Sequence, residues 1–243
     1  LDPIVRRNEF KLVGILNGID PDYYNPETDA SIFSHYSIDN LEPKKRCKEE
    51  LQKMFNLPVK PDTPIIAVIS RLVSHKGLDL VRTVIEEVLR QDVQIIILGK
   101  GDSSYENYFT DLARRYVGKF VAVIAFNPDL SRKIYSGADL FLMPSKSEPC
   151  GLSQMIASRY GTVPIVRETG GLYDSIKPVG NGGNGFTFAN YNAYDMLYVI
   201  REAINCYYNK DFWPELMKRV MSVDFSWQRS AKEYEKVYGE MLK

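Results

Sequence analysis

The chain has 243 residues, of which 44% are hydrophobic and 26% are charged, as is typical of a folded globular protein. Lysine plus arginine and aspartate plus glutamate each total 31, so no net field would attract nucleic acid or an anionic membrane. The apolar runs are also far shorter than the ~20 residues that span a bilayer. The composition therefore predicts neither nucleic acid nor a membrane as a partner.

The cysteines and histidines indicate a reducing compartment and give no sign of a metal. Cys47, Cys150 and Cys206 are odd in number and widely spaced, which favours free thiols and a cytoplasmic location over a disulfide framework. His35 and His75 are the histidines of the chain, and no CxxC pair accompanies them. We therefore expect no metal site.

Residues 1–60 are predicted to form an arm that leads into a larger domain. Residues 11–20, with the sequence KLVGILNGID, predict a strand and a turn, and residues 21–30 predict a loop. Residues 43–56 are rich in lysine, arginine and glutamate, which predicts a surface helix.

From residue 64 onward, short apolar runs alternate with helix-like segments. The runs are dense in isoleucine, valine and leucine without in/out alternation, as expected for strands buried on both faces. They cover residues 64–70, 93–99, 120–126, 139–144 and 163–168, and a sixth candidate covers 184–188. The helix-like segments cover residues 76–91, 103–117, 130–137, 151–160, 192–209, 213–222 and 227–242. This order predicts an α/β fold with a doubly wound parallel sheet and C-terminal helices.

Ligands of such sheets bind at the carboxyl ends of the strands, so the loops there are the places to look for chemistry. The loop after the first strand, SRLVSHKG, carries Arg71 and Lys76. Two cations presented from one strand end suit an anionic ligand, above all a diphosphate. A solvated basic loop is the alternative.

Two further loops carry weaker signals. GKGD at residues 99–102 resembles a phosphate loop but lacks the GxGxxG spacing, so its glycines could serve only a tight turn. Phe126 follows the third strand. An aromatic residue there is either part of the core or a platform on which a ligand base stacks.

The loop after the fourth strand, SEPCGLSQ, carries the strongest signal. Gly151, Leu152 and Ser153 are predicted to begin a helix whose free amides form an anion site, and no acidic residue occupies its first turn. Glu148 precedes that turn, where Pro149 would hold it in place. A carboxylate repels phosphate but accepts hydrogen bonds from hydroxyls, so the pair of features fits a nucleotide sugar. An ordinary surface glutamate is the alternative.

Two other features of this region give weaker evidence about the site. Cys150 has no obvious histidine partner, which argues against a nucleophile. After the fifth strand, ETGGLYDSI supplies another helix start, with Gly170 and Gly171 allowing close backbone approach.

Taken together, these motifs carry a family resemblance. ILNGIDPDYYNP, SRLVSHKGLDL, ILGKGD, SEPCGLSQMIASRYGTVPIVRETGGLYDSI and NGFTF, in this order, resemble the C-terminal half of bacterial-type starch/glycogen synthases. Those enzymes are retaining GT-B glycosyltransferases that use a nucleotide-diphosphate glucose, commonly ADP-glucose. The resemblance runs from about residue 11 to the end of the chain.

The resemblance implies a role for each matching position. The catalytic set would be Arg71 and Lys76, which neutralise the leaving diphosphate, and Glu148, which holds the sugar hydroxyls. Nucleotide-sugar binding would involve backbone amides and a stacking ring, supplied by Phe126, Cys150, Gly151, Leu152 and Ser153. Relatives usually have tyrosine at the position of Phe126 and often threonine at that of Ser153. The set requires no metal and no cofactor.

The resemblance also implies a larger enzyme. The family's N-terminal domain, with a Lys-x-Gly-Gly phosphate loop and most of the acceptor site, is absent from this sequence. Residues 1–20 would be the end of the interdomain linker, residues 21–243 the Rossmann-like nucleotide-sugar-binding domain, and residues 227–242 a helix that crosses back. The whole enzyme would transfer glucose from ADP-glucose to the non-reducing end of an α-1,4-glucan with retention, and the isolated domain would be inactive. The alternatives are a non-catalytic nucleotide- or glucan-binding module and another GT-B glycosyltransferase, such as a sucrose or trehalose-phosphate synthase relative.

Overall fold

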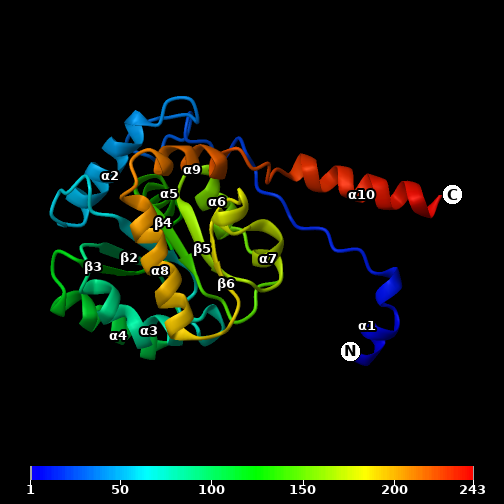
Figure 1. Cartoon of the computed structure of the whole chain (residues 1–243), viewed down its shortest axis with the longest axis horizontal. Coiled ribbons are helices and arrows are strands. Elements are labelled where there is room, and N and C mark those ends of the chain that lie inside the picture. The colour runs from blue at the N-terminus through cyan, green and yellow to red at the C-terminus, as the bar shows by residue number, and fades with distance from the viewer. Residues whose placement is uncertain (1, 243) are drawn as a thin grey trace.

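The computed structural model describes residues 2–242, with the backbone alone at position 181. Six parallel strands form one sheet in the order β3-β2-β1-β4-β5-β6. They are β1 (Ile65–Ile69), β2 (Gln94–Gly99), β3 (Phe120–Ile124), β4 (Leu140–Met143), β5 (Val163–Arg167) and β6 (Phe186–Phe188). Each lies within a predicted strand, so the doubly wound α/β fold is confirmed (Figure 1).

Helices connect and follow the strands. The α-helices are α1 (Asp2–Arg7), α2 (Glu42–Met54), α3 (Leu78–Leu89), α4 (Ser103–Arg115), α5 (Pro128–Gly137), α6 (Ser153–Arg159), α7 (Gly171–Ser175), α8 (Ala193–Tyr207), α9 (Phe212–Met221) and α10 (Trp227–Met241). Three 3₁₀ turns accompany them, η1 (Glu9–Lys11), η2 (Ser74–Lys76) and η3 (Val179–Asn181). Within residues 2–242, none of these helices has the length and apolarity needed to cross a bilayer.

Two hydrophobic clusters cover the two faces of the sheet. In β1, Ile66 and Val68 point into the cluster formed with α3, α4, α8 and α9, whereas Ile65 and Ala67 point into the cluster formed with α2, α5, α6 and α7. Because both faces are covered, the central strands need apolar residues at every position. The continuous apolar runs of the sequence follow from this arrangement.

β3 departs from the expected burial on both faces. Phe120 is buried, but the next four residues of the strand are only partly buried. The reason is position, since β2 is the one strand within residues 2–242 that pairs with β3, which makes β3 an edge strand.

The predicted strand within residues 11–20 is wrong. This segment has no strand and makes only an isolated parallel bridge, between Ile19 and Ser226. The Ile19 amide donates to the Phe225 carbonyl at 2.8 Å, which joins the arm to the start of α10. From Ile19 onward the arm packs on the sheet domain, whereas α1 buries no residue and projects away from it with α10 (Figure 1).

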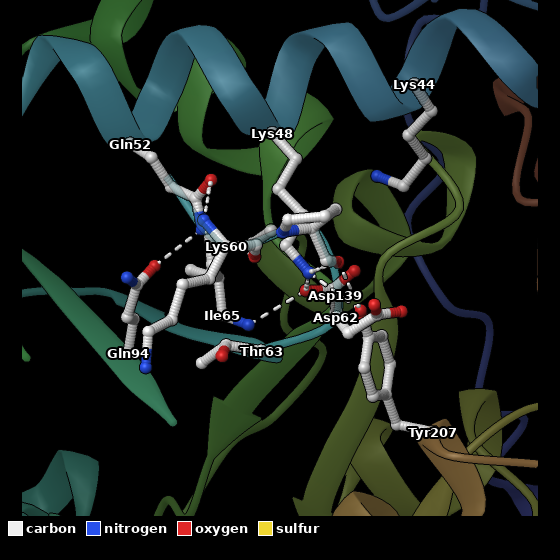
Figure 2. Close-up of polar contacts among 12 residues, drawn as sticks. Lys44, Lys48, Gln52, Lys60, Asp62, Thr63, Ile65, Gln94, Asp139 and Tyr207 are labelled. Atoms are coloured by element: carbon white, nitrogen blue, oxygen red, sulfur yellow. Dashed lines mark hydrogen bonds and ion pairs between the residues drawn. The ribbon is translucent and has the colours of Figure 1, made fainter. Parts of the chain in front are cut away.

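A buried polar network fastens α2 to the amino ends of the strands (Figure 2). Lys48 Nζ lies 2.7 Å from Asp139 Oδ2, and the same oxygen accepts from the Ile65 amide at 2.8 Å. Lys44 donates to the Ser136 carbonyl at 2.8 Å, close to the C-terminus of α5, where a cation is favoured. The surface helix predicted at residues 43–56 is therefore present, but its lysines are partly structural.

Candidate nucleotide-sugar site

The sheet order reverses direction between β1 and β4, which makes this the topological switch point of the fold. β1 and β4 are neighbours, with Ile66 opposite Leu140 and Ala67 opposite Phe141. Their carboxyl-end loops, residues 70–77 and 144–152, therefore lie side by side. They are the two loops in which sequence analysis placed the cations and the carboxylate.

Lys76 and Glu148 meet in this crevice. Lys76 Nζ lies 2.5 Å from Glu148 Oε2, and their side chains are only 16% and 10% exposed. The Ser145 hydroxyl also donates to Glu148 Oε2, at 3.3 Å. Glu148 is thus a held, largely buried carboxylate, which rules out the alternative of an ordinary surface glutamate.

Tight backbone packing brings the two loops together. Gly77 has a φ of +75°, and a Cβ atom there would lie 2.0 Å from the Pro144 carbonyl oxygen. The Lys146 amide donates to the His75 carbonyl at 2.8 Å. Glycine is required at position 77 because only glycine allows both the left-handed backbone and this close contact.

Arg71 shares the loop of Lys76 but is exposed. Its Nη2 atom lies 3.3 Å from His75 Nε2. The guanidinium makes no ion pair with a carboxylate within residues 2–242 and remains free to meet an anion.

The start of α6 differs from the prediction by two residues. The helix begins at Ser153, and Gly151, with a φ of +73°, and the exposed Leu152 precede it. The reason is the left-handed backbone of Gly151, which cannot continue into a helix. The first turn contains no acidic residue, as expected. Within residues 2–242 the amides of positions 151–153 have no protein acceptor.

The structure decides between the alternatives left open for Phe126 and for the GKGD loop. Phe126 is 89% exposed, so it does not belong to the core. β3 lies two strands from β1, which separates Phe126 from the Lys76 loop by about 10 Å along the sheet edge. In GKGD, a Cβ at Gly99 would lie 1.9 Å from the Ser70 carbonyl oxygen, and the Gly101 amide donates to Glu106. Those glycines therefore serve close packing.

Cys150 and the glycines after β5 lie next to Glu148 in the crevice. The Cys150 thiol is half-buried, and its polar contact is the neighbouring Gly151 carbonyl at 3.6 Å. The Gly171 amide donates to the Glu148 carbonyl at 3.0 Å. A Cβ at Gly171 would lie 2.1 Å from the Cys150 carbonyl oxygen, which confirms the predicted close approach.

Sequence reasoning missed a group of residues that surrounds the loop of Glu148. Arg167, at the end of β5, donates to the Lys146 carbonyl at 2.8 Å. Its guanidinium lies 5.4 Å from the ring centre of Tyr191, whose hydroxyl donates to Asp79 Oδ1 at 2.5 Å. Burial is the largest cause that raises the pKa of Tyr191, and the hydrogen bond to Asp79 raises it further. The hydroxyl therefore stays protonated and can donate this bond. The sequence signal that could have identified Arg167 is a charged residue at the carboxyl end of an apolar strand.

A cavity of about 650 Å³ lies at the opposite ends of the strands, their amino ends, and is lined by residues of α2 and α9 among others. Three of its lysines already have carboxylate partners at 2.6–2.7 Å, in the pairs Lys45–Glu42, Lys48–Asp139 and Lys210–Asp62. Lys44 Nζ donates to the Ser136 carbonyl and to the Thr162 hydroxyl. We place the candidate site at the switch point because ligands of open parallel sheets bind there, outside the carboxyl ends of the strands, and because Arg71 has no carboxylate partner within residues 2–242.

The fold, a six-stranded parallel sheet with helices on both faces, is the Rossmann-like fold of a GT-B glycosyltransferase domain. Residues 49–218 match the family described as "Glycosyl transferases group 1", and the chain belongs to this family.

Particular relatives narrow the comparison. The whole chain is 51% identical to a glycogen synthase of Bacillus cereus (strain Q1), covering 52% of that protein. It is 48% identical to a glycogen synthase of Geobacillus stearothermophilus, covering 51% of it. The structure described as the catalytic domain of starch synthase IV from Arabidopsis thaliana bound to ADP and acarbose superposes with a TM-score of 0.91 at 35% identity, covering 98% of this chain and 50% of that one. The resemblance to starch/glycogen synthases is confirmed, and the chain spans about half the length of these relatives.

Proposed function

We propose that this chain is the donor-binding half of a glycogen or starch synthase that transfers glucose from ADP-glucose to the non-reducing end of an α-1,4-glucan with retention. The observation that carries the proposal is the convergence of Lys76 and Glu148 at the switch point. A cation and a carboxylate fixed side by side suit a ligand that is anionic at one end and rich in hydroxyls at the other.

The two groups neutralise each other across the crevice and would exchange partners when the donor binds. Lys76, with Arg71, would take the diphosphate, and Glu148 would accept hydrogen bonds from the glucose hydroxyls. As the bond between the sugar and the phosphate breaks, negative charge grows on the leaving diphosphate. Fixed cations aimed at that charge lower the barrier.

The remaining predicted residues would bind the rest of the nucleotide. The amides of Cys150, Gly151, Leu152 and Ser153 would meet phosphate and sugar, and Phe126 would stack on the base. Its exposure leaves the ring face available, and the starch synthase IV relative was solved with ADP. This supports ADP as the nucleotide of the donor.

The partner of this chain would be an N-terminal GT-B domain. Residues 1–20 would belong to the linker and α10 would cross back to that domain, which is supported by the exposed apolar side chains of both segments, among them Phe10, Val13, Tyr238 and Met241. The chain alone would bind the donor but not elongate glucan, because alignment of the acceptor, worth ~7–11 kcal/mol, needs both domains. We place the enzyme in the cytoplasm, where its three free thiols stay reduced.

The test is a transfer assay on the full-length protein. It is incubated with labelled ADP-glucose or UDP-glucose and a malto-oligosaccharide primer, and the new linkage is identified by digestion with an α-1,4-specific exoglucosidase. We expect elongation with ADP-glucose that falls severely, but to a measurable rate, in Glu148→Gln, and no elongation by the 243-residue chain alone. Nucleotide binding without any transfer by the full-length protein would favour the non-catalytic binding module instead.

A further inference from the structure

We propose that Arg167 is a positioning residue for Glu148, and that it acts by holding the backbone of the loop that carries this carboxylate. The inference rests on the proposed function, in which Glu148 binds the glucose of the donor.

Arg167 reaches this loop from the neighbouring strand. It ends β5, which pairs with β4, and the loop of residues 144–149 leaves the end of β4. Arg167 Nη1 donates to the Lys146 carbonyl at 2.8 Å and lies 3.4 Å from the Ser145 carbonyl oxygen. The hydroxyl of the same Ser145 contacts the Glu148 carboxylate at 3.3 Å. One residue therefore separates the guanidinium from the proposed sugar-binding group.

Within residues 144–149, the other anchors of the backbone are backbone groups. The side-chain amide of Gln154 holds only the later carbonyls of Cys150 and Gly151, and Lys76 contacts the Glu148 carboxylate rather than the backbone. The Lys146 amide donates to the His75 carbonyl, and the Glu148 carbonyl accepts from the Gly171 amide. Neither bond can be removed by changing a side chain. Arg167 supplies the side-chain donor to the carbonyls of the loop, which makes it the position where the positioning can be tested by mutation.

The guanidinium is itself held in place. Its Nε atom is buried without a hydrogen-bond partner within residues 2–242, so its polar contacts run through Nη1 to the loop. The ring of Tyr191 lies 5.4 Å from the guanidinium, and the Tyr191 hydroxyl is tied to Asp79 at the start of α3. The result is a chain of contacts from α3 through Tyr191 and Arg167 to the loop of Glu148.

Removing this anchor should matter for catalysis more than for nucleotide binding. ADP lacks the glucose that Glu148 would hold, so a relaxed loop leaves ADP affinity nearly intact. A displacement of ~1 Å at the reacting centre can cost ~10²-fold in rate.

The experiment is a double-mutant cycle in the full-length enzyme. Arg167→Met, Glu148→Gln and the double variant are compared for turnover of ADP-glucose and, by calorimetry, for ADP affinity. Arg167→Lys keeps the charge and one donor, and serves as a rescue variant. Arg167→Gln, which removes the charge, takes the place of Arg167→Met in the cycle if that protein does not fold. Arg201→Met, which removes an exposed arginine paired with Glu87, is the matched control.

We expect Arg167→Met to lower kcat about 10–100-fold with ADP affinity within about twofold, Arg167→Lys to recover part of the loss, and Arg201→Met to be neutral. In the Glu148→Gln background the Arg167 change should add no more than about twofold, because the group it positions is gone. Additive losses, unchanged kcat or a parallel fall in ADP affinity would each overturn the inference while leaving the proposed function standing. A Glu148→Gln enzyme with normal turnover would overturn both.

Discussion

Lys76 and Glu148 lie 72 positions apart in the sequence, yet their side chains meet at 2.5 Å across the switch point of the sheet. Both are largely buried, at 16% and 10% exposure. Removing either partner alone leaves the other charge in a poorly solvated place, whereas the proposed donor would give each group a new partner. The pair therefore links the stability of the folded chain to the ligand preference of the crevice.

The first prediction concerns this pair. Lys76→Met should lower the free energy of unfolding of the chain by about 1–3 kcal/mol, because Glu148 then stays buried without a cation. Glu148→Gln in the same protein should restore part of the loss. Urea unfolding of the four proteins of the cycle measures the coupling energy, which we expect at about 1–3 kcal/mol. A coupling energy indistinguishable from zero would mean that the contact contributes nothing.

Phe126 should matter for nucleotide affinity and not for stability. Phe126→Ala should weaken ADP binding by about 1–3 kcal/mol, the typical value of base–aromatic stacking. Because the ring is 89% exposed, the free energy of unfolding should hardly change. Calorimetry with ADP and with inorganic pyrophosphate separates the base from the diphosphate, and Phe126→Tyr is the control that keeps the ring. Equal weakening of both ligands would remove Phe126 from the base site.

Gly77 should tolerate no side chain. Gly77→Ala would place a Cβ atom 2.0 Å from the Pro144 carbonyl oxygen at a φ of +75°. The left-handed backbone alone costs roughly 1–2 kcal/mol for a non-glycine residue, and the clash adds to it. Thermal unfolding should show a large loss for this variant and almost none for Gly14→Ala, whose Cβ would meet nothing within 4 Å. Similar melting temperatures for the two variants would contradict the tight loop contact.

Lys44 should make stability depend on pH. Burial lowers the pKa of Lys44 to about 8. The unfolded chain therefore binds more protons than the folded chain between about pH 8 and the ordinary lysine pKa of ~10.4, so stability must rise with pH in that window. Relative to Lys44→Met, the wild-type chain should gain about 1 kcal/mol of unfolding free energy between ~pH 7 and ~pH 9. Urea unfolding of both proteins at the two pH values measures this difference. A decrease in the free energy of unfolding of the wild type relative to Lys44→Met between these pH values would contradict the prediction.

The sheet could be predicted because its strands are buried on both faces. Runs such as residues 64–70 and 93–99 are dense in apolar residues without in/out alternation, and both faces of β1 and β2 are indeed covered. The segment at residues 11–20 also contains apolar residues but forms no strand, because its bridge partner is the single residue Ser226 at the start of α10. Composition shows that a segment favours extended backbone, but not whether a neighbour exists to pair with it.

Candidate site residues could be named from the sequence, but the contacts among them could not be predicted. Strand-end loops made Arg71, Lys76 and Glu148 candidates, whereas the bond between Lys76 and Glu148 depends on the adjacency of β1 and β4. Arg167 was missed because its contact is with a backbone carbonyl, and the one sequence signal for it, a charged residue at the end of an apolar strand, does not reveal that contact. The same is true of the Lys48–Asp139 pair, whose partners lie far apart in the chain.

The central claim is that Glu148 holds the sugar of the donor while Lys76 holds its diphosphate. The most direct measurement is a calorimetric titration of the chain and its Glu148→Gln variant with ADP and with ADP-glucose, since the chain alone should bind the donor without transferring its glucose to glucan. A hydrogen bond to a charged group is worth ~1.5–3 kcal/mol, so Glu148→Gln should weaken ADP-glucose binding about tenfold or more. Its ADP affinity should stay within about twofold of wild type, since ADP offers no glucose hydroxyl to accept from. An equal loss for both ligands would contradict the assignment of Glu148 to the sugar.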